Sequence, residues 1–569
     1  MRKKKLAAAL LAAGMVVASV TGCGGGDTAT TGGDESAKGS TDEKKDDAGS
    51  GEVTEFTMFI SSPGSEINSD NEIANIIAEK TGVKVKETFL TGQTAEEAVG
   101  TYIASGDYTD YINGGDGMVK LYEAGALIPW DDYIDKYPNI KEFLTPEEWD
   151  MFRQDDGKIY WLNPFDNSYG EDKTTTHGGE AFWIQTRVLK WAGYPEIKTL
   201  DQYFDLLEKY NEANPTMEDG ATTNIPYTIL CEDWRYFCLE NAPQFLDGYP
   251  NDGSCMVDKE TLTVMDYNTS DTAKKYFNKL NEEYKKGIVD PESFTQTYDE
   301  YIAKLSTGRV LGMVDQWWDF AYTINDILKT QGLDKQGCNY VPMGLVIDEG
   351  MENRWYTAGD TVNVSSGIGI TVNCKDPDKA FKFIDDCLSQ EIHDLRFWGV
   401  EGVDYLVDDE GLFYRTEDIR MQVADTDYKA SHMCSYSNFP QYGGTSRDGK
   451  NAMTPAQQPT EFFDSLTDDL KECFEAYGCQ TYIDFLNSDS ERPGEWFPMW
   501  SFSNSFSTAT PGGTAWTKIG EIKHEYLPKV CMADDFESAW TEYMGVYDSC
   551  NPQDYLGELQ EELNRRVGK

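Results

Sequence analysis

The sequence has few histidines and few basic residues for its length, and both shortages bear on function. Four histidines occur in 569 residues, and 49 Lys and Arg stand against 100 Asp and Glu, for a formal net charge of -51. A chain this acidic repels the phosphates of nucleic acids and of anionic lipid head groups, so we expect neither as a partner. Acidic runs such as Asp408-Asp409-Glu410 are typical of solvated faces.

Motifs for catalysis, metals and nucleotides are also missing. The sequence has no GxSxG elbow, no HExxH helix, no CxxC pair and no calcium loop of EF-hand spacing. The nearest phosphate-loop match, residues 444–450, is followed by Asn451 where Ser or Thr is required. We therefore expect no catalytic residue, no cofactor and no metal site that spacing reveals.

Only one apolar run, from residue 6 to about residue 20, approaches the roughly 20 residues of a membrane-spanning helix. It follows four basic residues, 2–5, and ends at Val20-Thr21-Gly22-Cys23. This pattern resembles a bacterial lipoprotein signal, which implies a signal peptide over 1–22 and a lipid on Cys23. The protein would then be anchored to the cell membrane on its extracellular face.

The segment after Cys23 is almost entirely Gly, Ser, Thr, Ala and charged residues, without an aromatic side chain. Because it cannot bury a core, we interpret residues 23–52 as a flexible tether. The folded body would begin at about Val53.

Twelve cysteines suggest disulfides, but lipidation of Cys23 leaves eleven, so at least one thiol stays unpaired. If their segment is helical, Cys231 and Cys238 lie about 10 Å apart, too far for a bridge. Cys473 and Cys479 are more plausible partners, because Gly478 ends a helix between them.

The body starts with alternating strand and helix signals, which predict an α/β fold with a largely parallel sheet. We expect strands at 56–60, 83–90 and 108–112, and helices from about Asp70 to Gly82, at 94–105 and at 118–124. In such sheets the loops at the carboxyl ends of strands form the ligand crevice, here 61–66 and 113–116.

A series of motifs in order along the body resembles the extracellular solute-binding proteins of ABC importers, best of all the large lipoprotein members that bind oligosaccharides. The residues that carry the resemblance are 103–107, 110, 123–134, 157–160, 163–164, 182–187, 189, 193, 199–201, 279–280, 287–291, 304–309, 367–370, 376–377, 380–384 and 401–405.

The resemblance implies a two-lobed, type II periplasmic-binding-protein-like fold whose chain crosses a hinge more than once and closes on a solute. Lobe 1 would comprise 53–180 and 345–400, and lobe 2 would comprise 181–344 and 401–569. The expected partners are a small-molecule solute, an oligosaccharide, and membrane permease subunits on separate chains.

A sugar offers apolar C–H faces edged by hydroxyl groups, so its site combines aromatic rings with polar side chains. The chain holds 14 Trp, 33 Tyr and 26 Phe, more than a core requires. Candidate contacts are Asn113, Asp116, Trp234, Arg235, Trp317, Trp318, Asp319, Trp496 and Trp500.

Three alternatives remain open from the sequence. Core packing or helix capping is the alternative explanation of a cluster such as 315–319, and related scaffolds bind peptides or other small solutes. A secreted glycoside hydrolase would instead require two carboxyl groups roughly 5–10 Å apart across the cleft.

Overall fold

The computed structural model describes residues 53–62, 64–165, 167–355, 363–486, 493–494 and 496–568. The predicted signal peptide, Cys23 and the tether lie outside the described residues. Among the residues that the structure describes, no helix is both long and apolar enough to cross a membrane.

The first sheet has five strands in the order β2-β1-β3-β12-β4. Its members are β1 (Thr54–Ile60), β2 (Val83–Phe89), β3 (Tyr111–Asn113), β12 (Ile368–Ile370) and β4 (Trp161–Leu162). β1 pairs in parallel with β2 and β3, whereas β12 joins β3 and β4 antiparallel. The predicted parallel start is confirmed, and the antiparallel half comes from a strand that returns some 250 residues later.

Local capping signals position the first helices. Asn71 caps α1 (Glu72–Thr81) through its side chain, and Gly82 ends the helix at φ 69°. Thr94 and Glu97 form a capping box on α2 (Ala95–Ser105), which Gly106 ends. These helices and α3 (Met118–Glu123) match the predicted ones, whereas the third strand begins at Tyr111 rather than at residue 108.

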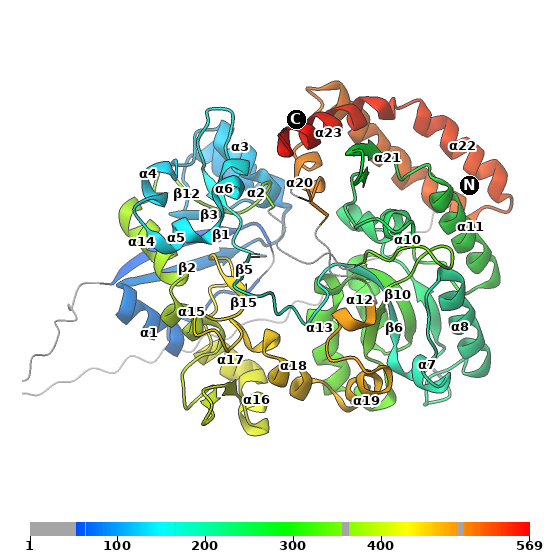
Figure 1. Cartoon of the computed structure of the whole chain (residues 1–569), viewed down its shortest axis with the longest axis horizontal. Helices are drawn as coiled ribbons and strands as arrows, with labels where there is room; N and C mark the ends of the chain where they lie inside the picture. Colours follow the sequence, from blue (N-terminus) through cyan, green and yellow to red (C-terminus); the bar gives the residue numbers. More distant parts are fainter. Residues whose placement is uncertain are drawn as a thin grey trace, which may run out of the picture. The chain divides into compact units, whose positions relative to one another are not determined.

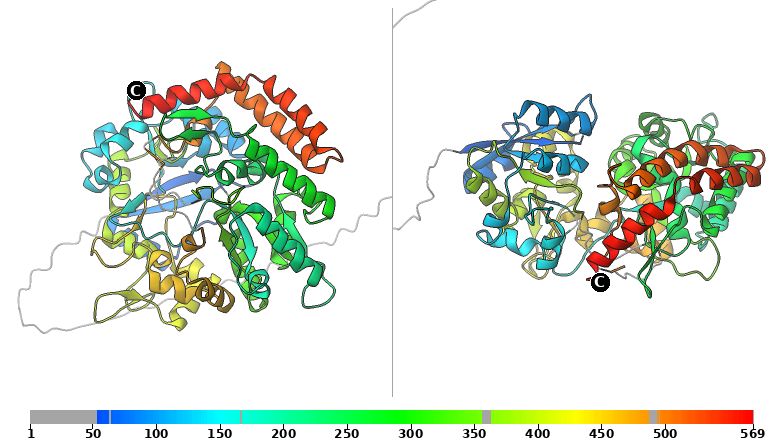
Figure 2. Two further views of the ribbon diagram at one scale, coloured as in Figure 1. Left: turned by 45° about the vertical axis from the view of Figure 1, so that its right-hand side comes forward. Right: turned by 90° about the horizontal axis from the view of Figure 1, so that it is seen from above.

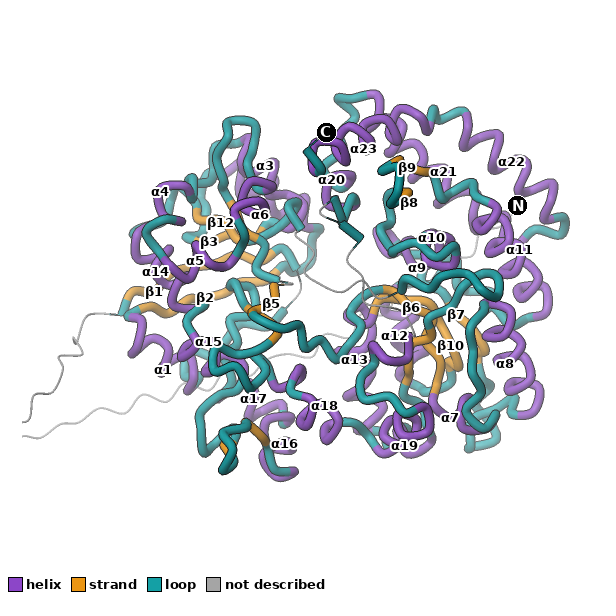
Figure 3. The backbone as a smooth tube through the Cα atoms, viewed as in Figure 1, coloured by secondary structure: helices purple, strands orange, loops and turns teal. Residues whose placement is uncertain are grey.

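The second sheet has the order β11-β6-β10-β7. Its strands are β6 (Glu180–Gln185), β7 (Ile225–Thr228), β10 (Val310–Gln316) and β11 (Tyr340–Met343). β10 runs parallel to β7 and antiparallel to β6. Every residue of β6 is buried, as expected for a central strand covered on both faces. Figure 3 shows the strands gathered into separate groups with helices around them.

Helices of the C-terminal region pack beside the second sheet's own helices. α21 (Pro511–Met532) contacts α11 (Asp271–Lys286), α22 (Phe536–Asp548) and α23 (Pro552–Arg566). The views in Figures 1 and 2 show this orange and red group beside the green helices. Tyr543, Tyr547, Leu559 and Leu563 belong to the same hydrophobic core as β6 and β10.

Two hydrophobic cores define two lobes, and they divide the chain differently from the expected boundaries. Leu345 and Trp355 pack in the core of the second sheet. Cys434, Phe439 and Tyr442 pack in the core of the first. The reason is pairing: β15 (Tyr442–Gly444) adds in parallel to β5 (Asn167–Tyr169), which holds the segment up to about residue 453 on the first lobe.

Every cysteine within the described residues is a free thiol. Cys473 and Cys479, the pair that spacing made most plausible, do not form a bridge in the structure.

Candidate ligand-binding site

An exposed aromatic surface forms where β10 ends and α13 (Trp317–Thr330) begins. Phe320, Ala321, Ile324 and Leu328 bury one face of α13 in the core. Trp318 and Tyr322 are four residues apart on another face, and both remain exposed. The amphipathic pattern of the helix therefore directs two rings away from the core.

A second tryptophan joins this surface from the short helix η2 (Asp233–Tyr236). The rings of Trp234 and Trp318 lie nearly parallel, 5.8 Å apart at 11°. Trp317 packs edge-on against Tyr322, with ring centroids 4.7 Å apart. The exposed fractions are 53% for Trp234, 39% for Trp318 and 70% for Tyr322. We name Trp234, Trp317, Trp318 and Tyr322 the aromatic platform.

Arg235 fixes the polar edge of the aromatic platform. Its Nε donates to both carboxylate oxygens of Asp319, at 3.0 and 3.1 Å. Its guanidinium lies 4.4 Å from the ring centre of Trp234 and 4.1 Å from that of Tyr298. Arg235 thus makes cation–π contacts with two aromatic rings while it pairs with a buried carboxylate.

A second carboxyl group lies beneath this pair. Asp315, fully buried, accepts hydrogen bonds from the Tyr301 hydroxyl and the Gln316 amide, both at 2.7 Å. Burial, aided by the charge of Asp319, raises the pKa of Asp315 to about 8. Burial also raises the pKa of Asp319, against the opposing effect of Arg235. The layer below the platform therefore combines the hydrogen bonds of Asp315 with the ion pair between Arg235 and Asp319.

The predicted residues of the first lobe lie at the end of β3. The Asn113 side chain accepts from the Gly115 amide at 3.1 Å, and Asp116 accepts from Ser365 at 3.3 Å. Asn113 is buried and shapes its own turn, whereas Asp116 is exposed. Gly115, at φ 56°, allows this turn to pass close to Ser61, whose Oγ would lie 2.8 Å from a Cβ there.

The two tryptophans predicted to cover the cleft are not part of the aromatic platform. Trp496 is 4% exposed and packs in the core of the second lobe, where its carbonyl accepts from Arg566. Trp500, partly exposed, is the first residue of α20 (Trp500–Ser503). The Pro- and Gly-rich sequence around Trp496 and Trp500 suggested an exposed loop over the cleft. In the structure the Trp496 ring is instead buried and packs against Phe497.

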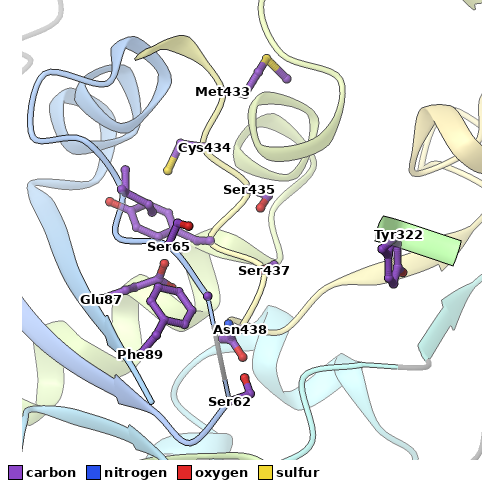
Figure 4. Close-up of a pocket in the computed structure, with 13 residues that line it drawn as sticks. Ser62, Ser65, Glu87, Phe89, Tyr322, Met433, Cys434, Ser435, Ser437 and Asn438 are labelled. Atoms are coloured by element: carbon purple, nitrogen blue, oxygen red, sulfur yellow. The ribbon is translucent and has the colours of Figure 1, made fainter. Parts of the chain in front are cut away.

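A cavity of about 540 Å³ opens on the first lobe. Figure 4 shows its lining, with Tyr322 set apart from the other labelled residues. Most of the lining comes from three segments, namely the loop after β1, the end of β2 and residues 433–438. Tyr322 belongs both to this lining and to the aromatic platform, so one residue adjoins both surfaces.

Sequence reasoning missed Tyr322, Glu87 and the 433–438 segment. For Tyr322 and Glu87, a pattern in the sequence could have indicated their positions. Tyr322 follows Trp318 by one helical turn, and Glu87 continues the core-facing alternation of Val83 and Val85. The 433–438 segment has no such pattern, because only the tertiary fold brings it to the end of β2.

Among the described residues, no group of three or more His, Cys, Asp or Glu side chains is arranged to hold a metal ion.

This chain is similar to substrate-binding proteins of transporters. The substrate-binding protein FusA of a fructooligosaccharide ABC transporter in Streptococcus pneumoniae is 30% identical over 265 residues. That alignment covers 43% of this chain and 47% of FusA, so it spans about half the length of the relative.

Solved structures extend the likeness to nearly the whole fold. FusA in complex with fructo-nystose, an EF-hand mutant, superposes with a TM-score of 0.61 at 19% identity, over 91% of this chain and 100% of that one. A solute-binding protein from Bifidobacterium longum infantis, described as HMO-binding and ABC-transporter-associated, gives 0.61 at 15% identity, over 90% and 98%. The fold is the two-lobed type II solute-binding fold.

A family model, described as bacterial extracellular solute-binding protein, matches residues 72–402. This match spans more than half of the chain and includes the second sheet and every strand of the first sheet except β1. The chain therefore belongs to the bacterial extracellular solute-binding protein family.

Proposed function

We propose that this protein is the substrate-binding subunit of an ABC importer and captures a neutral oligosaccharide on the aromatic platform. The observation that carries the proposal is the exposed, nearly parallel pair of Trp234 and Trp318 beside the Arg235–Asp319 ion pair. Flat rings suit the C–H faces of a sugar, and the neighbouring polar groups suit its hydroxyls.

The relatives support the same ligand class, since FusA is named for fructooligosaccharide transport and the Bifidobacterium protein for HMO binding. Delivery to the permease would need no chemistry on the ligand, so we propose binding without turnover. We further propose that the chain is anchored by a lipid on Cys23, which keeps it beside the permease on the extracellular face.

The test is calorimetric titration of the purified protein with neutral oligosaccharides, short peptides and polyamines, with ligand integrity checked afterwards. We expect one glycan to bind and to be recovered intact. Trp318→Ala and Trp234→Ala should each weaken its binding by about tenfold or more, equivalent to about 1.4 kcal/mol, because half of the stacking surface is lost. Trp191→Ala is the matched control, since Trp191 is 48% exposed on α7 (Thr186–Trp191), outside the platform.

Two results would contradict the proposal. Heat released only with peptides or polyamines would be compatible with the fold but would contradict the proposal that the ligand is a sugar. A shortened glycan after incubation would replace binding with hydrolysis.

A further inference from the structure

Glu87 is a carboxyl group on the core-facing side of a strand. Side chains of β2 alternate between the core and the other face of the sheet. Val83 and Val85 on the core-facing side are 1% and 3% exposed, and Glu87, next on the same side, is 4% exposed. Its Oε1 has no hydrogen-bond partner within the described part of the chain. Burial raises the pKa of Glu87 to about 7. A buried carboxyl oxygen without a partner destabilises the fold, so its presence points to a partner that the protein itself does not supply.

Arg396 is close enough to act electrostatically on Glu87, but its hydrogen-bond donors are already used. Arg396 is 1% exposed. It donates five hydrogen bonds, all to backbone carbonyls, those of Cys387, Ser435, Tyr436, Phe439 and Pro440. A guanidinium has five N–H donors, so none is left for Glu87. The positive charge opposes the rise in the pKa of Glu87 without closing a hydrogen bond.

The same carbonyl contacts build one wall of the cavity. They hold residues 435–440 in place, while the Asn71 amide donates to the Met433 carbonyl at 2.7 Å. Tyr436 adopts a left-handed backbone conformation, φ 42°, and its hydroxyl accepts from the Val85 amide at 3.3 Å. A strained residue fixed by the surrounding structure is typical of a functional position.

The chemistry of the cavity wall is that of a hydroxyl-binding site. Besides Glu87, the polar side chains that line the cavity are Ser62, Ser65, Cys434, Ser435, Tyr436, Ser437 and Asn438. Phe89 and Tyr322 add aromatic surface. Gly64 lies directly on the Phe89 ring, where an added Cβ would come within 2.3 Å of it. The volume of about 540 Å³ falls within the range of roughly 300–1,000 Å³ that is usual for small-molecule sites.

We propose that this cavity is a second sugar subsite, in which Glu87 and the surrounding serine and asparagine side chains bind the hydroxyl groups of one hexose unit of a neutral oligosaccharide. The proposal rests on the proposed function. Tyr322 adjoins both this cavity and the aromatic platform, so a single chain of at least two units would occupy both surfaces.

The test uses one series of neutral oligosaccharides of increasing length, titrated calorimetrically into the full chain. Glu87→Gln keeps the size of the side chain and replaces the carboxyl group with an amide. We expect it to weaken binding of the longer sugars by about tenfold, and to leave the shortest sugars, which occupy only the platform, within about twofold of the parent. Glu55→Gln is the matched control, an exposed glutamate on the adjacent strand β1. Trp318→Ala should weaken every length.

The outcomes separate the two proposals. If Glu87→Gln matches the parent at every length while Trp318→Ala is defective, the subsite is overturned and the proposed function stands. If the parent binds no neutral glycan, the proposed function fails and the subsite fails with it. If only sugars that carry an amino group bind, the assignment of the cavity to a neutral hexose is wrong. Should Glu87→Gln lose its near-ultraviolet circular dichroism, Asn438→Ala replaces it under the same length criterion.

Discussion

At the scale of single residues, Arg235 holds the aromatic platform to the protein below it. Its side chain is 19% exposed, and that of its partner Asp319 is 2% exposed. Two more contacts fix the surroundings, since the Tyr298 hydroxyl donates to the Asp319 carbonyl at 2.7 Å and the ring of Tyr298 lies against the guanidinium. The orientation of Trp234 therefore depends on a pair of charges that water hardly reaches.

Removing Arg235 alone should destabilise the protein more than removing both charges. In Arg235→Ala the carboxylate of Asp319 stays buried without its partner, which should cost up to about 3 kcal/mol of unfolding free energy. The double variant Arg235→Ala with Asp319→Asn should recover part of that loss, because no charge is stranded. Urea unfolding measures both.

The control for this prediction is Arg153→Ala. The Arg153 guanidinium pairs with the partly exposed Asp131 and the exposed Asp150. A surface pair of this kind should contribute less than about 1 kcal/mol. If the single and the double variants lose the same unfolding free energy, Arg235 stabilises the protein through its ring contacts and not through its charge.

At the scale of elements, helices with complete end signals were predictable and the site-forming segments were not. Asn71, Gly82 and the capping box of Thr94 and Glu97 specify α1 and α2 from neighbouring residues alone. Trp317, Trp318 and Asp319 were found because an apolar strand ends just before them. The 433–440 segment has no periodicity, and the carbonyl contacts of Arg396 from α15 (Gln390–Phe397) give it its shape.

Arg396→Lys should loosen that segment while leaving the sheets in place. A lysine has three donors on one nitrogen and cannot satisfy five carbonyl groups. We expect a lower unfolding temperature and weaker binding of the longer sugars in the length series described above. Differential scanning calorimetry and the same titrations measure the two effects.

Arg153→Lys, at an exposed surface pair, is the control for Arg396→Lys and should change neither quantity. A lower unfolding temperature with unchanged binding of the longer sugars would separate the segment from the ligand.

At the scale of the whole molecule, the thiols are an unusual feature for an exported protein. Eleven cysteines are free in the described residues, and only Cys374 and Cys479 among them are not buried. Burial raises the pKa of Cys374 to about 11 and that of Cys479 to about 12, so neither forms a reactive thiolate at neutral pH. The fold is therefore held by its two cores rather than by disulfides.

A reducing agent should accordingly leave the unfolding temperature unchanged. A thiol reagent followed by mass spectrometry should label no more than the two partly exposed cysteines of the native protein's described part, and all eleven after denaturation. A clear fall in the unfolding temperature on reduction would reveal a disulfide and contradict the prediction.

The sequence by itself determined the α/β class, the helix ends and the family, because these depend on neighbouring residues and on motifs that keep their order along the chain. It also identified the Trp234, Arg235 and 317–319 segments as candidates, through the types of side chain they combine. Only the tertiary structure decided that Trp496 is core, that residues 434–453 pack with the first lobe, and that Glu87 lines a cavity. These depend on contacts between residues hundreds of positions apart, and no local pattern encodes which of two cores a segment will join.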